Sequence, residues 1–402
     1  MNNQTKQTKQ TKKSKGGKSI ASGGFGCVFL PALKCKNKTR TKGISKLSFL
    51  KQSEKEFDIL EAIKYELSRI PNYKKYFLID NISICTPDKL EITDKINLDR
   101  CTFLGENGIY AENINKNLSK FKIINMPYGG KDLDNIISNK GISFEKAKLL
   151  LINLLLKAII PMNKLNMFHL DIKSNNILFN KDGIKIIDYG EMALSNRMHF
   201  LPNILLNKSI QFNSPFSVIL FNQFIINNIN KLFAKSKIKK SSKYQAKFNI
   251  VQKSYLEFKN LFLFGKDHTY LLEYFLLPAI LKLLPDSLIK QVFNVRKEDL
   301  NVNQIVMDMI IKYCLTVIDK YYDFKNYQFK YNEYFSEIYS KNVDVYGFIM
   351  CFMPYILTTD LYSTNLRIQI SQFIIKYCFS PLYAIEVIPI NRLLRDLKKI
   401  NL

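Results

Sequence analysis

Side chains that could do chemistry gather in one short stretch in the middle of the 402-residue chain. The stretch reads His169-Leu170-Asp171-Ile172-Lys173-Ser174-Asn175-Asn176, and a second one, Ile186-Ile187-Asp188-Tyr189-Gly190, follows it. In-line transfer of a phosphoryl group requires a carboxylate at the acceptor hydroxyl, a cation near the moving charge, and oxygen ligands for a metal ion. The two stretches offer all of these groups. The alternative is an ordinary surface loop in which Asp and Asn serve turns.

The segment between the two stretches decides whether these groups can meet. The apolar runs 177–179 and 184–187 predict two short strands, and Asp182-Gly183 between them is typical of a hairpin turn. A hairpin would return the chain to its starting edge and would bring the two stretches around one point. Spacing, order and strand context therefore favour a site over a plain loop.

The two stretches resemble the catalytic loop, H-x-D-x-K-x-x-N, and the metal-binding loop, D-F-G, of eukaryotic-type protein kinases. The resemblance implies that Asp171 orients the acceptor hydroxyl or accepts its proton, and that Lys173 screens the moving phosphoryl group. It also implies that Asn176 and Asp188 hold Mg²⁺.

A glycine-rich segment near the N-terminus resembles the loop with which kinases cover the phosphates of ATP. Its backbone can approach phosphates because glycine has no Cβ, although a plain glycine-rich turn would explain the segment equally well. The first glycine of the family pattern is replaced by alanine. The residues that the resemblance assigns to the nucleotide are Ile20, Ala21, Ser22, Gly23, Gly24, Phe25, Gly26, Cys27 and Val28.

Lys46 is the lysine expected to hold the α- and β-phosphates. Its apolar neighbours in Ile44-Ser45-Lys46-Leu47 fit an internal strand, whereas the nearby lysines lie in a polar loop. Lys42 is the runner-up, and another solvated lysine in a lysine-rich region is the plain alternative.

Glu56 is the expected ion-pair partner of Lys46. It lies on a helix predicted over 52–67, in a stretch that resembles the kinase helix that carries the pairing glutamate. Its separation from Lys46 is shorter than usual in kinases, so Glu54 and Glu61 remain alternatives.

The predicted strand 121–126 and the break after it resemble the hinge between kinase lobes. Adenine would bind backbone groups there, with Met126 beside the gatekeeper position and Tyr128 in the hinge. Pro127 has no N–H, so a neighbour must supply any backbone donor. A strand that ends in a turn explains the same residues locally.

Two later motifs appear in the expected order. Asn213-Ser214-Pro215-Phe216 stands where kinases have Ala-Pro-Glu, so the buried ion pair of that glutamate is missing. Asp344 begins a stretch that resembles the central helix of the C-lobe, where an aspartate caps the catalytic-loop backbone. A plain helix cap is the alternative.

Leu170 replaces the arginine that many kinases use to grip a phosphate on the activation segment. This departure predicts an enzyme that is active without phosphorylation of Gly190–Pro215. Arg197 or another basic residue in place of the missing arginine is the alternative. The residues expected to hold the segment by burial are Met192, Ala193, Leu194, Phe200, Leu201, Ile204 and Leu205.

The resemblance implies an α+β, bilobal protein-kinase-like fold. We expect a small β-rich N-lobe at 20–126 and a large helical C-lobe at 127–402, with a helical insertion or a rebuilt lower lobe at about 217–343. The clearest helix is predicted over 144–165, where Pro161 kinks or ends it.

Residues 1–19 are rich in lysine and contain no acid, which predicts a disordered basic tail. Its deletion is expected to leave thermal stability nearly unchanged. The tail and the net charge of +26 would suit an acidic partner or nucleic acid. However, Lys, Asn, Ile, Phe and Tyr are abundant together, and A/T-rich codons would supply the same charge without selection for binding.

Composition excludes several classes of protein. A hydrophobic share of 47% excludes a wholly disordered chain, and no uncharged apolar run is long enough to cross a bilayer. The N-terminus lacks the apolar segment of a secretory signal. Seven dispersed cysteines without a Cys-x-x-Cys pair, with three histidines, indicate a reducing compartment and no structural zinc. We therefore expect an intracellular protein without a membrane span.

Several motifs, among them the glycine-rich segment, the hinge-like stretch after residue 126 and Asn213-Ser214-Pro215-Phe216, look most like those of the divergent serine/threonine kinases of large cytoplasmic DNA viruses. That resemblance implies transfer of the γ-phosphoryl group of Mg-ATP to a Ser or Thr of a protein substrate, in the host cytoplasm or the virion. One alternative is a catalytically weak pseudokinase or scaffold that binds nucleotide. Another is a small-molecule phosphotransferase of related fold. The retained catalytic residues argue against a scaffold, and Lys173 favours a protein acceptor.

Overall fold

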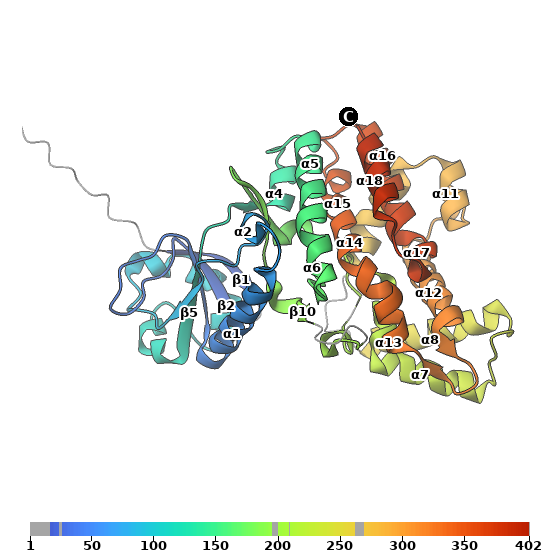
Figure 1. Cartoon of the computed structure of the whole chain (residues 1–402), viewed down its shortest axis with the longest axis horizontal. Coiled ribbons are helices and arrows are strands. Elements are labelled where there is room, and N and C mark those ends of the chain that lie inside the picture. The colour runs from blue at the N-terminus through green and yellow to red at the C-terminus, as the bar shows by residue number, and fades with distance from the viewer. Residues whose placement is uncertain (1–16, 24–25, 195–199, 209, 262–268, 402) are drawn as a thin grey trace, which may run out of the picture. The chain divides into compact units, whose positions relative to one another are not determined.

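The computed structural model describes residues 17–23, 26–194, 200–208, 210–261 and 269–401. These residues form two compact units. The first unit comprises the chain up to Glu66 together with Leu78–Gly129, and the second comprises Leu67–Phe77 together with Gly130–Leu402. The first unit carries a β-sheet, and the second is mainly helical (Figure 1). The predicted α+β class, β-rich at the N-terminal side and helical at the C-terminal side, is therefore confirmed. The lobe limits and the insertion stay predictions.

In its described residues, the first unit is built on a five-stranded antiparallel sheet of order β1-β2-β3-β5-β4. The predicted strand at 121–126 is present as β5, and the one at Ile44 extends to Phe49. The strands are β1 (Lys18–Gly23), β2 (Gly26–Leu30), β3 (Ile44–Phe49), β4 (Ser83–Cys85) and β5 (Phe121–Met126).

The segment between β4 and β5 covers one face of this sheet. Successive side chains of a strand point to opposite faces, so Cys27 with Phe29 and Phe121 with Ile123 share a face. They form one buried cluster with Leu98 and Phe103 of the covering segment. The helices of the unit are α1 (Leu50–Leu67), which follows β3 directly, and α3 (Thr102–Glu106).

Four of the cysteines are paired, which corrects the expectation of a reduced, unpaired set. Disulfides join Cys27 to Cys101 and Cys35 to Cys85, with Cα–Cα distances of 5.8 and 5.9 Å. The paired cysteines are 74 and 50 residues apart in sequence. Their spacing therefore could not reveal that the fold brings them together.

The predicted basic tail is wrong at its C-terminal end. Lys18 and Ser19 belong to β1 and pair with Leu30 and Phe29 of β2. The Gly17 N–H donates to the buried Asp94 carboxylate at 2.6 Å. Backbone hydrogen bonds thus take these residues into the sheet, although their composition continues that of the preceding stretch. Residues 1–16 lie outside the described residues.

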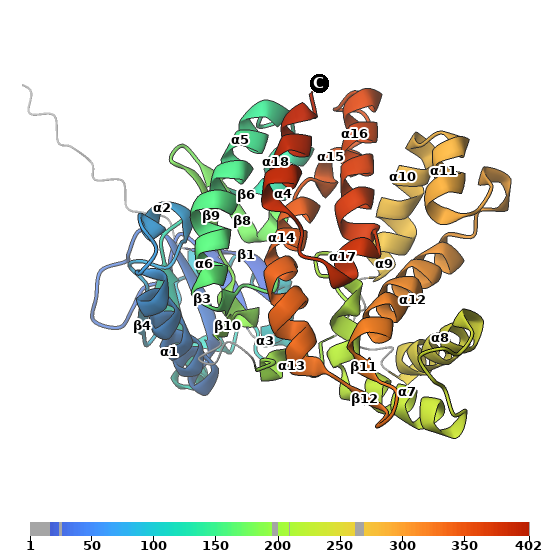
Figure 2. The ribbon, with the colours of Figure 1, turned by 45° about the vertical axis from the view of Figure 1, so that its right-hand side comes forward.

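The second unit packs its helices around long apolar faces. In both views α14 lies beside α6 (Figures 1 and 2). The helices are α2 (Tyr73–Tyr76), α4 (Leu133–Ser138), α5 (Phe144–Leu154), α6 (Ile160–Lys164), α7 (Gln223–Lys235), α8 (Tyr244–Leu261), α9 (Thr269–Leu271), α10 (Leu277–Leu283), α11 (Asp286–Phe293), α12 (Val302–Tyr321), α13 (Tyr331–Tyr334), α14 (Ser340–Met350), α15 (Met353–Leu357), α16 (Thr364–Ile374), α17 (Leu382–Ile385) and α18 (Ile390–Lys399).

Short strands support the loops of this unit. β6 (Lys131–Asp132), β8 (Ile177–Asn180) and β9 (Gly183–Ile186) form one small sheet, and β8 and β9 are the predicted hairpin. The pairs β7–β10 and β11–β12 are also antiparallel. Their strands are β7 (Met167–Phe168), β10 (Ala193–Leu194), β11 (Tyr322–Asp323) and β12 (Gln328–Phe329).

The helix predicted over 144–165 does not end at Pro161, since helical structure continues to Lys164. A π turn, Leu155–Ile159, separates α5 from α6, and Pro161 lies in the first turn of α6. Proline cannot donate the hydrogen bond of a regular helix, and the wider turn accommodates that loss.

Phe216, which replaces the glutamate of the family motif, packs into an aromatic cluster. Its ring stacks on Phe379 at 5.9 Å and meets Tyr313 and Tyr346 edge-on at 5.6 and 6.4 Å. Apolar contact with α12 and α14 therefore takes the place of an ion pair at this end of the segment.

We expect deletion of residues 1–19 to destabilise the protein more than deletion of residues 1–16. The longer deletion removes a donor from buried Asp94 and two strand pairs, which together stabilise by about 1–3 kcal/mol. Urea unfolding of the two variants measures the difference. Equal midpoints would show that Gly17–Ser19 contribute nothing to the fold.

Candidate active site

The buried carboxylate of Asp344 holds the backbone of the loop 169–176, the predicted catalytic loop. Its Oδ2 accepts from the His169 N–H and its Oδ1 from the Leu170 N–H, both at 2.9 Å. Asn163 Nδ2 also donates to Oδ2, at 2.7 Å. Asp344 lies inside α14 and makes the contact to the catalytic loop that the sequence motif implied.

Gly347 lets α14 approach this loop at backbone distance. A Cβ at Gly347 would lie 2.5 Å from the Ile172 carbonyl oxygen and 2.8 Å from its Cβ. Glycine is therefore needed at this position because the contacting atoms belong to the loop backbone and to the base of its side chain.

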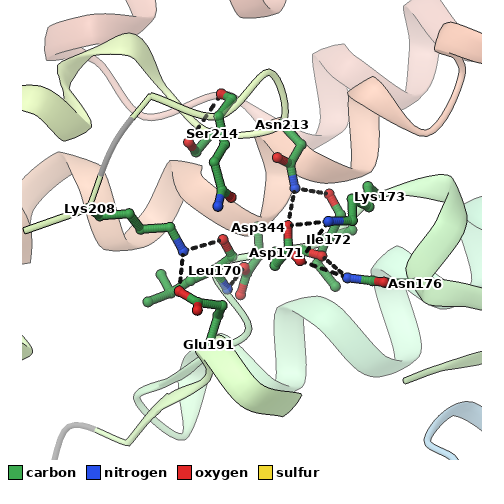
Figure 3. Close-up of polar contacts among 11 residues, drawn as sticks. Leu170, Asp171, Ile172, Lys173, Asn176, Glu191, Lys208, Asn213, Ser214 and Asp344 are labelled. Atoms are coloured by element: carbon green, nitrogen blue, oxygen red, sulfur yellow. Dashed lines mark hydrogen bonds and ion pairs between the residues drawn. The ribbon is translucent and has the colours of Figure 1, made fainter. Parts of the chain in front are cut away.

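Three side chains surround the Asp171 carboxylate (Figure 3). Lys173 Nζ lies 2.8 Å from Oδ2 and 3.1 Å from Oδ1. Asn176 Nδ2 donates to Oδ2 at 2.8 Å, and Asn213 Nδ2 donates to Oδ1 at 2.9 Å. The structure thus brings together Asp171, Lys173 and Asn176, three of the residues predicted from the sequence.

These contacts keep Asp171 ionised. Burial raises its pKa, but the Lys173 ammonium and the hydrogen bonds from Lys173 and Asn213 outweigh burial and leave the pKa below its usual value of 3.8. Because the folded-state pKa is depressed, the ionised group stabilises the fold fully above the usual value. That contribution is lost as the pH falls through the folded-state pKa.

Asn176 and Asp188 offer oxygen atoms that suit Mg²⁺. The Asn176 amide nitrogen donates to Asp171, and its oxygen points away from that carboxylate (Figure 3). The Ile187 N–H donates to the Asn176 carbonyl at 3.0 Å, which places exposed Asp188 one residue beyond this bond. One amide and one carboxylate fit Mg²⁺, which usually takes few protein ligands and completes its shell with water and phosphate.

The described residues contain no cluster of three or more His, Cys, Asp or Glu side chains that could hold a metal ion. The His169 ring makes a hydrogen bond within the fold. Its Nε2 lies 3.0 Å from the Ile187 carbonyl oxygen, which can only accept, so Nε2 carries the proton. The ring joins the catalytic loop to the strand that leads into Asp188.

In the first unit, Lys46 pairs with Glu56. Lys46 Nζ lies 2.7 Å from both carboxylate oxygens of Glu56. The short sequence separation is accommodated because α1 begins directly after β3. Of the alternatives, Glu61 pairs with Lys64. The predicted ion pair is therefore formed, with Lys46 beside Val28 and Ile124 in the sheet.

The glycine-rich segment forms the hairpin of β1 and β2, with a bulge between Ser19 and Ala21. A Cβ at Gly26 would lie 2.6 Å from the Leu47 carbonyl oxygen, so glycine permits the close approach of β2 to β3. Ser22 pairs with Cys27 across the hairpin, and Ile20 is exposed. Gly24 and Phe25 lie outside the described residues.

The two residues predicted to belong to a hinge, Met126 and Tyr128, lie at the end of β5 and just after it. Met126 pairs with Ile44 of β3, and Tyr128 is exposed just beyond the strand. Both lie at the C-terminal end of the first unit.

Sequence reasoning missed the roles of three residues in the second unit. Asn213 was placed only in a segment-closing motif, yet it bonds the Asp171 carboxylate. Lys208 bonds the Leu170 carbonyl, and Asp134 of α4 accepts from Ser174 Oγ at 2.9 Å. Burial raises the pKa of Asp134. The local sequence carried no signal for these contacts beyond the position of Asn213 before Pro215.

If the chain transfers phosphoryl groups, as the sequence motifs predict, Gly347→Ala should impair that transfer more than folding. The added methyl must displace the Ile172 backbone, which lies next to Asp171, and a displacement of this size can lower the rate about 100-fold. The turnover number of the variant and its unfolding midpoint are compared with those of Gly105→Ala, where a Cβ meets nothing within 4 Å. A normal turnover number in Gly347→Ala would contradict this account.

No family model and no curated protein matches the chain. Solved structures do match, among them the crystal structure of the yeast RNA Pol II CTD kinase CTDK-1 complex, at 20% identity and a TM-score of 0.28. That match covers 54% of this chain, and the chain spans 58% of the length of the matched one. A likeness at this identity and TM-score carries no argument about activity.

Proposed function

We propose that the chain is an ATP-dependent serine/threonine protein kinase. The observation that carries the proposal is the buried Asp171 carboxylate, which receives hydrogen bonds from Lys173, Asn176 and Asn213 on a loop capped by Asp344. An ordinary surface turn would not bury a carboxylate under so many converging donors.

Asp171 and Lys173 have complementary parts in the reaction. Asp171, kept ionised, accepts a hydrogen bond from the Ser or Thr hydroxyl and directs its oxygen toward the γ-phosphorus. A bond forms between that oxygen and phosphorus, the hydroxyl proton passes to the Asp171 carboxylate, and the bond from phosphorus to the β-phosphate oxygen breaks, so that ADP leaves. Lys173 lies within 3.1 Å of both Asp171 oxygens and balances negative charge on the moving group.

Asn176, through its amide oxygen, and Asp188, through its carboxylate, would hold Mg²⁺. The ion would neutralise charge on the phosphates of ATP. In the first unit, the Lys46–Glu56 pair would present an oriented ammonium to the α- and β-phosphates, on the strand next to the hairpin assigned to the phosphates. Met126 and Tyr128 would lie beside the adenine.

A pseudokinase or scaffold is the second candidate, since Ala21 and Phe216 depart from the family pattern. A small-molecule phosphotransferase is less well supported because of Lys173. Sequence motifs support kinship with the kinases of large DNA viruses and a place in the host cytoplasm or virion. The sequence also supports binding of an acidic partner or nucleic acid by the basic N-terminal residues. Among the described residues, no helix has the length and apolar character needed to cross a membrane.

We expect Asp171→Asn and Asp188→Asn to abolish phosphoryl transfer. The first removes the carboxylate at the acceptor and the second a metal ligand, and each lowers the rate by about 100- to 10,000-fold. Incorporation of γ-labelled phosphate into the chain, casein and histone measures the rate. Asp182→Asn, in the exposed β8–β9 turn, is the matched control.

Labelling of wild type and control, but of neither variant, supports the kinase. Wild type that binds Mg-ATP but labels no protein would favour the scaffold. Retained activity in Asp188→Asn would overturn the metal assignment.

We expect Asn213→Ala to move the acidic limb of the pH–rate profile to higher pH. Asn213 donates to the ionised form of Asp171, so its loss raises the pKa of that carboxyl and more activity disappears at low pH. The profile of kcat against pH is compared with that of Asn222→Ala, which removes a buried helix-capping Asn. An unshifted acidic limb would show that Asn213 does not tune Asp171.

A further inference from the structure

A buried ammonium group reaches the catalytic loop from the segment that follows Asp188. Lys208 is only 6% exposed. Its Nζ donates to the Leu170 carbonyl oxygen at 3.1 Å and to Glu191 Oε2 at 3.0 Å (Figure 3). Burying an ammonium group is costly unless it is paired, so this lysine must be held by the groups that it contacts.

The Leu170 peptide is held on both sides. Its backbone has a φ of +62°, a left-handed conformation that is unfavourable for leucine because its Cβ crowds the carbonyl oxygen. Its N–H donates to Asp344, and its carbonyl accepts from Lys208. Such a conformation persists only where the surroundings fix it. Because Asp171 is the next residue, the orientation of this peptide sets where its carboxylate begins.

Lys208 and Asn213 hold three consecutive residues of the loop. Lys208 bonds the carbonyl of Leu170, and Asn213 bonds the carboxylate of Asp171 and the carbonyl of Ile172, at 2.9 and 3.0 Å. The segment therefore supports the loop through a polar contact at each of these three positions.

Burial of the seven apolar residues expected to hold the segment does not replace these contacts. Of the seven residues expected to hold the segment, only Ala193 and Leu205 are buried in the described structure. Leu194 and Phe200 are 38% and 55% exposed, so the prediction is wrong for them. Side chains that remain in water cannot fix the segment by the hydrophobic effect. Ser195, Arg197 and Ser209 lie outside the described residues.

Glu191 supplies the negative charge that Lys208 needs. It is the only acidic residue between Gly190 and Pro215 in the sequence. With a carboxylate already in place, Lys208 requires no phosphate to neutralise it.

We propose that Lys208 is a positioning residue that, paired with Glu191, holds the Leu170 peptide and thereby Asp171 without phosphorylation of the segment. The proposal rests on the proposed kinase function for its effect on rate, but its effect on the loop is independent of that function. It assigns to Lys208 the place of the basic residue that Leu170 cannot supply.

The full-length chain offers a matched control for a test. Lys247 is also a buried lysine that bonds one carboxylate, Asp319, and one backbone carbonyl, that of Lys240. The side-chain exposures of the two ion pairs are 4% and 46% for Lys208–Glu191 and 6% and 40% for Lys247–Asp319. Lys208→Met and Lys247→Met therefore remove similar contacts, and only the first touches the catalytic loop.

Two readouts follow from the proposal. Hydrogen–deuterium exchange of the peptide 167–176 is measured without nucleotide, and faster exchange is expected in Lys208→Met but not in Lys247→Met. Labelling with γ-labelled ATP and casein should show kcat lowered about 30- to 100-fold in Lys208→Met, with the KM for ATP changed by less than about threefold. Phosphatase-treated wild type should keep its rate.

The pair is tested with Glu191→Gln. We expect a smaller loss than in Lys208→Met and no further loss in the double variant, because both changes remove one arrangement. Additive losses would overturn the role of Glu191. Exchange in Lys208→Met that matches the wild type or the Lys247→Met control would overturn the proposal, as would a large loss of rate after phosphatase treatment. If the wild type transfers no phosphate, the kinase proposal fails and the exchange experiment alone decides the role of Lys208.

Discussion

The contact between the Asp344 carboxylate and two consecutive backbone N–H groups supports the rest of the site. It fixes His169 and Leu170 at 2.9 Å from a buried anion, and it holds a left-handed leucine directly before Asp171. A buried carboxylate is stable only when hydrogen bonds satisfy it, so the loop and α14 depend on each other. The close approach at Gly347 adds a steric limit to this electrostatic one.

Around that anchor, acids and donors are balanced. Asp171 accepts hydrogen bonds from one ammonium and two amide groups, and Lys208 donates to one carboxylate and one carbonyl oxygen. The low dielectric of the protein interior strengthens such contacts when all partners are present, and it makes an unpaired buried polar group costly. The Asp171 carboxylate and the Lys208 ammonium are therefore each held by several partners, while Leu194 and Phe200 of the following segment stay exposed.

In the first unit, ion pairs and disulfides connect separate elements of the fold. Buried Asp94 binds Arg40 through both guanidinium arms and the Gly17 N–H, which ties the start of β1 to the segment that covers the sheet. Lys46 of β3 and Glu56 of α1 form an ion pair between adjoining elements. Two disulfides join the same covering segment and β4 to the remainder of the unit.

The sequence by itself located Asp171, Lys173, Asn176 and Asp188 and the hairpin between them, because their contacts form within one short stretch. It also placed Lys46 on an internal strand. The resemblance to a family motif also implied the contact of Asp344 with the loop, 174 residues away. Only the tertiary structure added Asn213 and Lys208, which lie 42 and 38 residues from their partners. It likewise paired four cysteines and drew Gly17–Ser19 into the first unit. Local patterns record spacing along the chain, whereas these contacts depend on packing between elements that the chain brings together only when it folds.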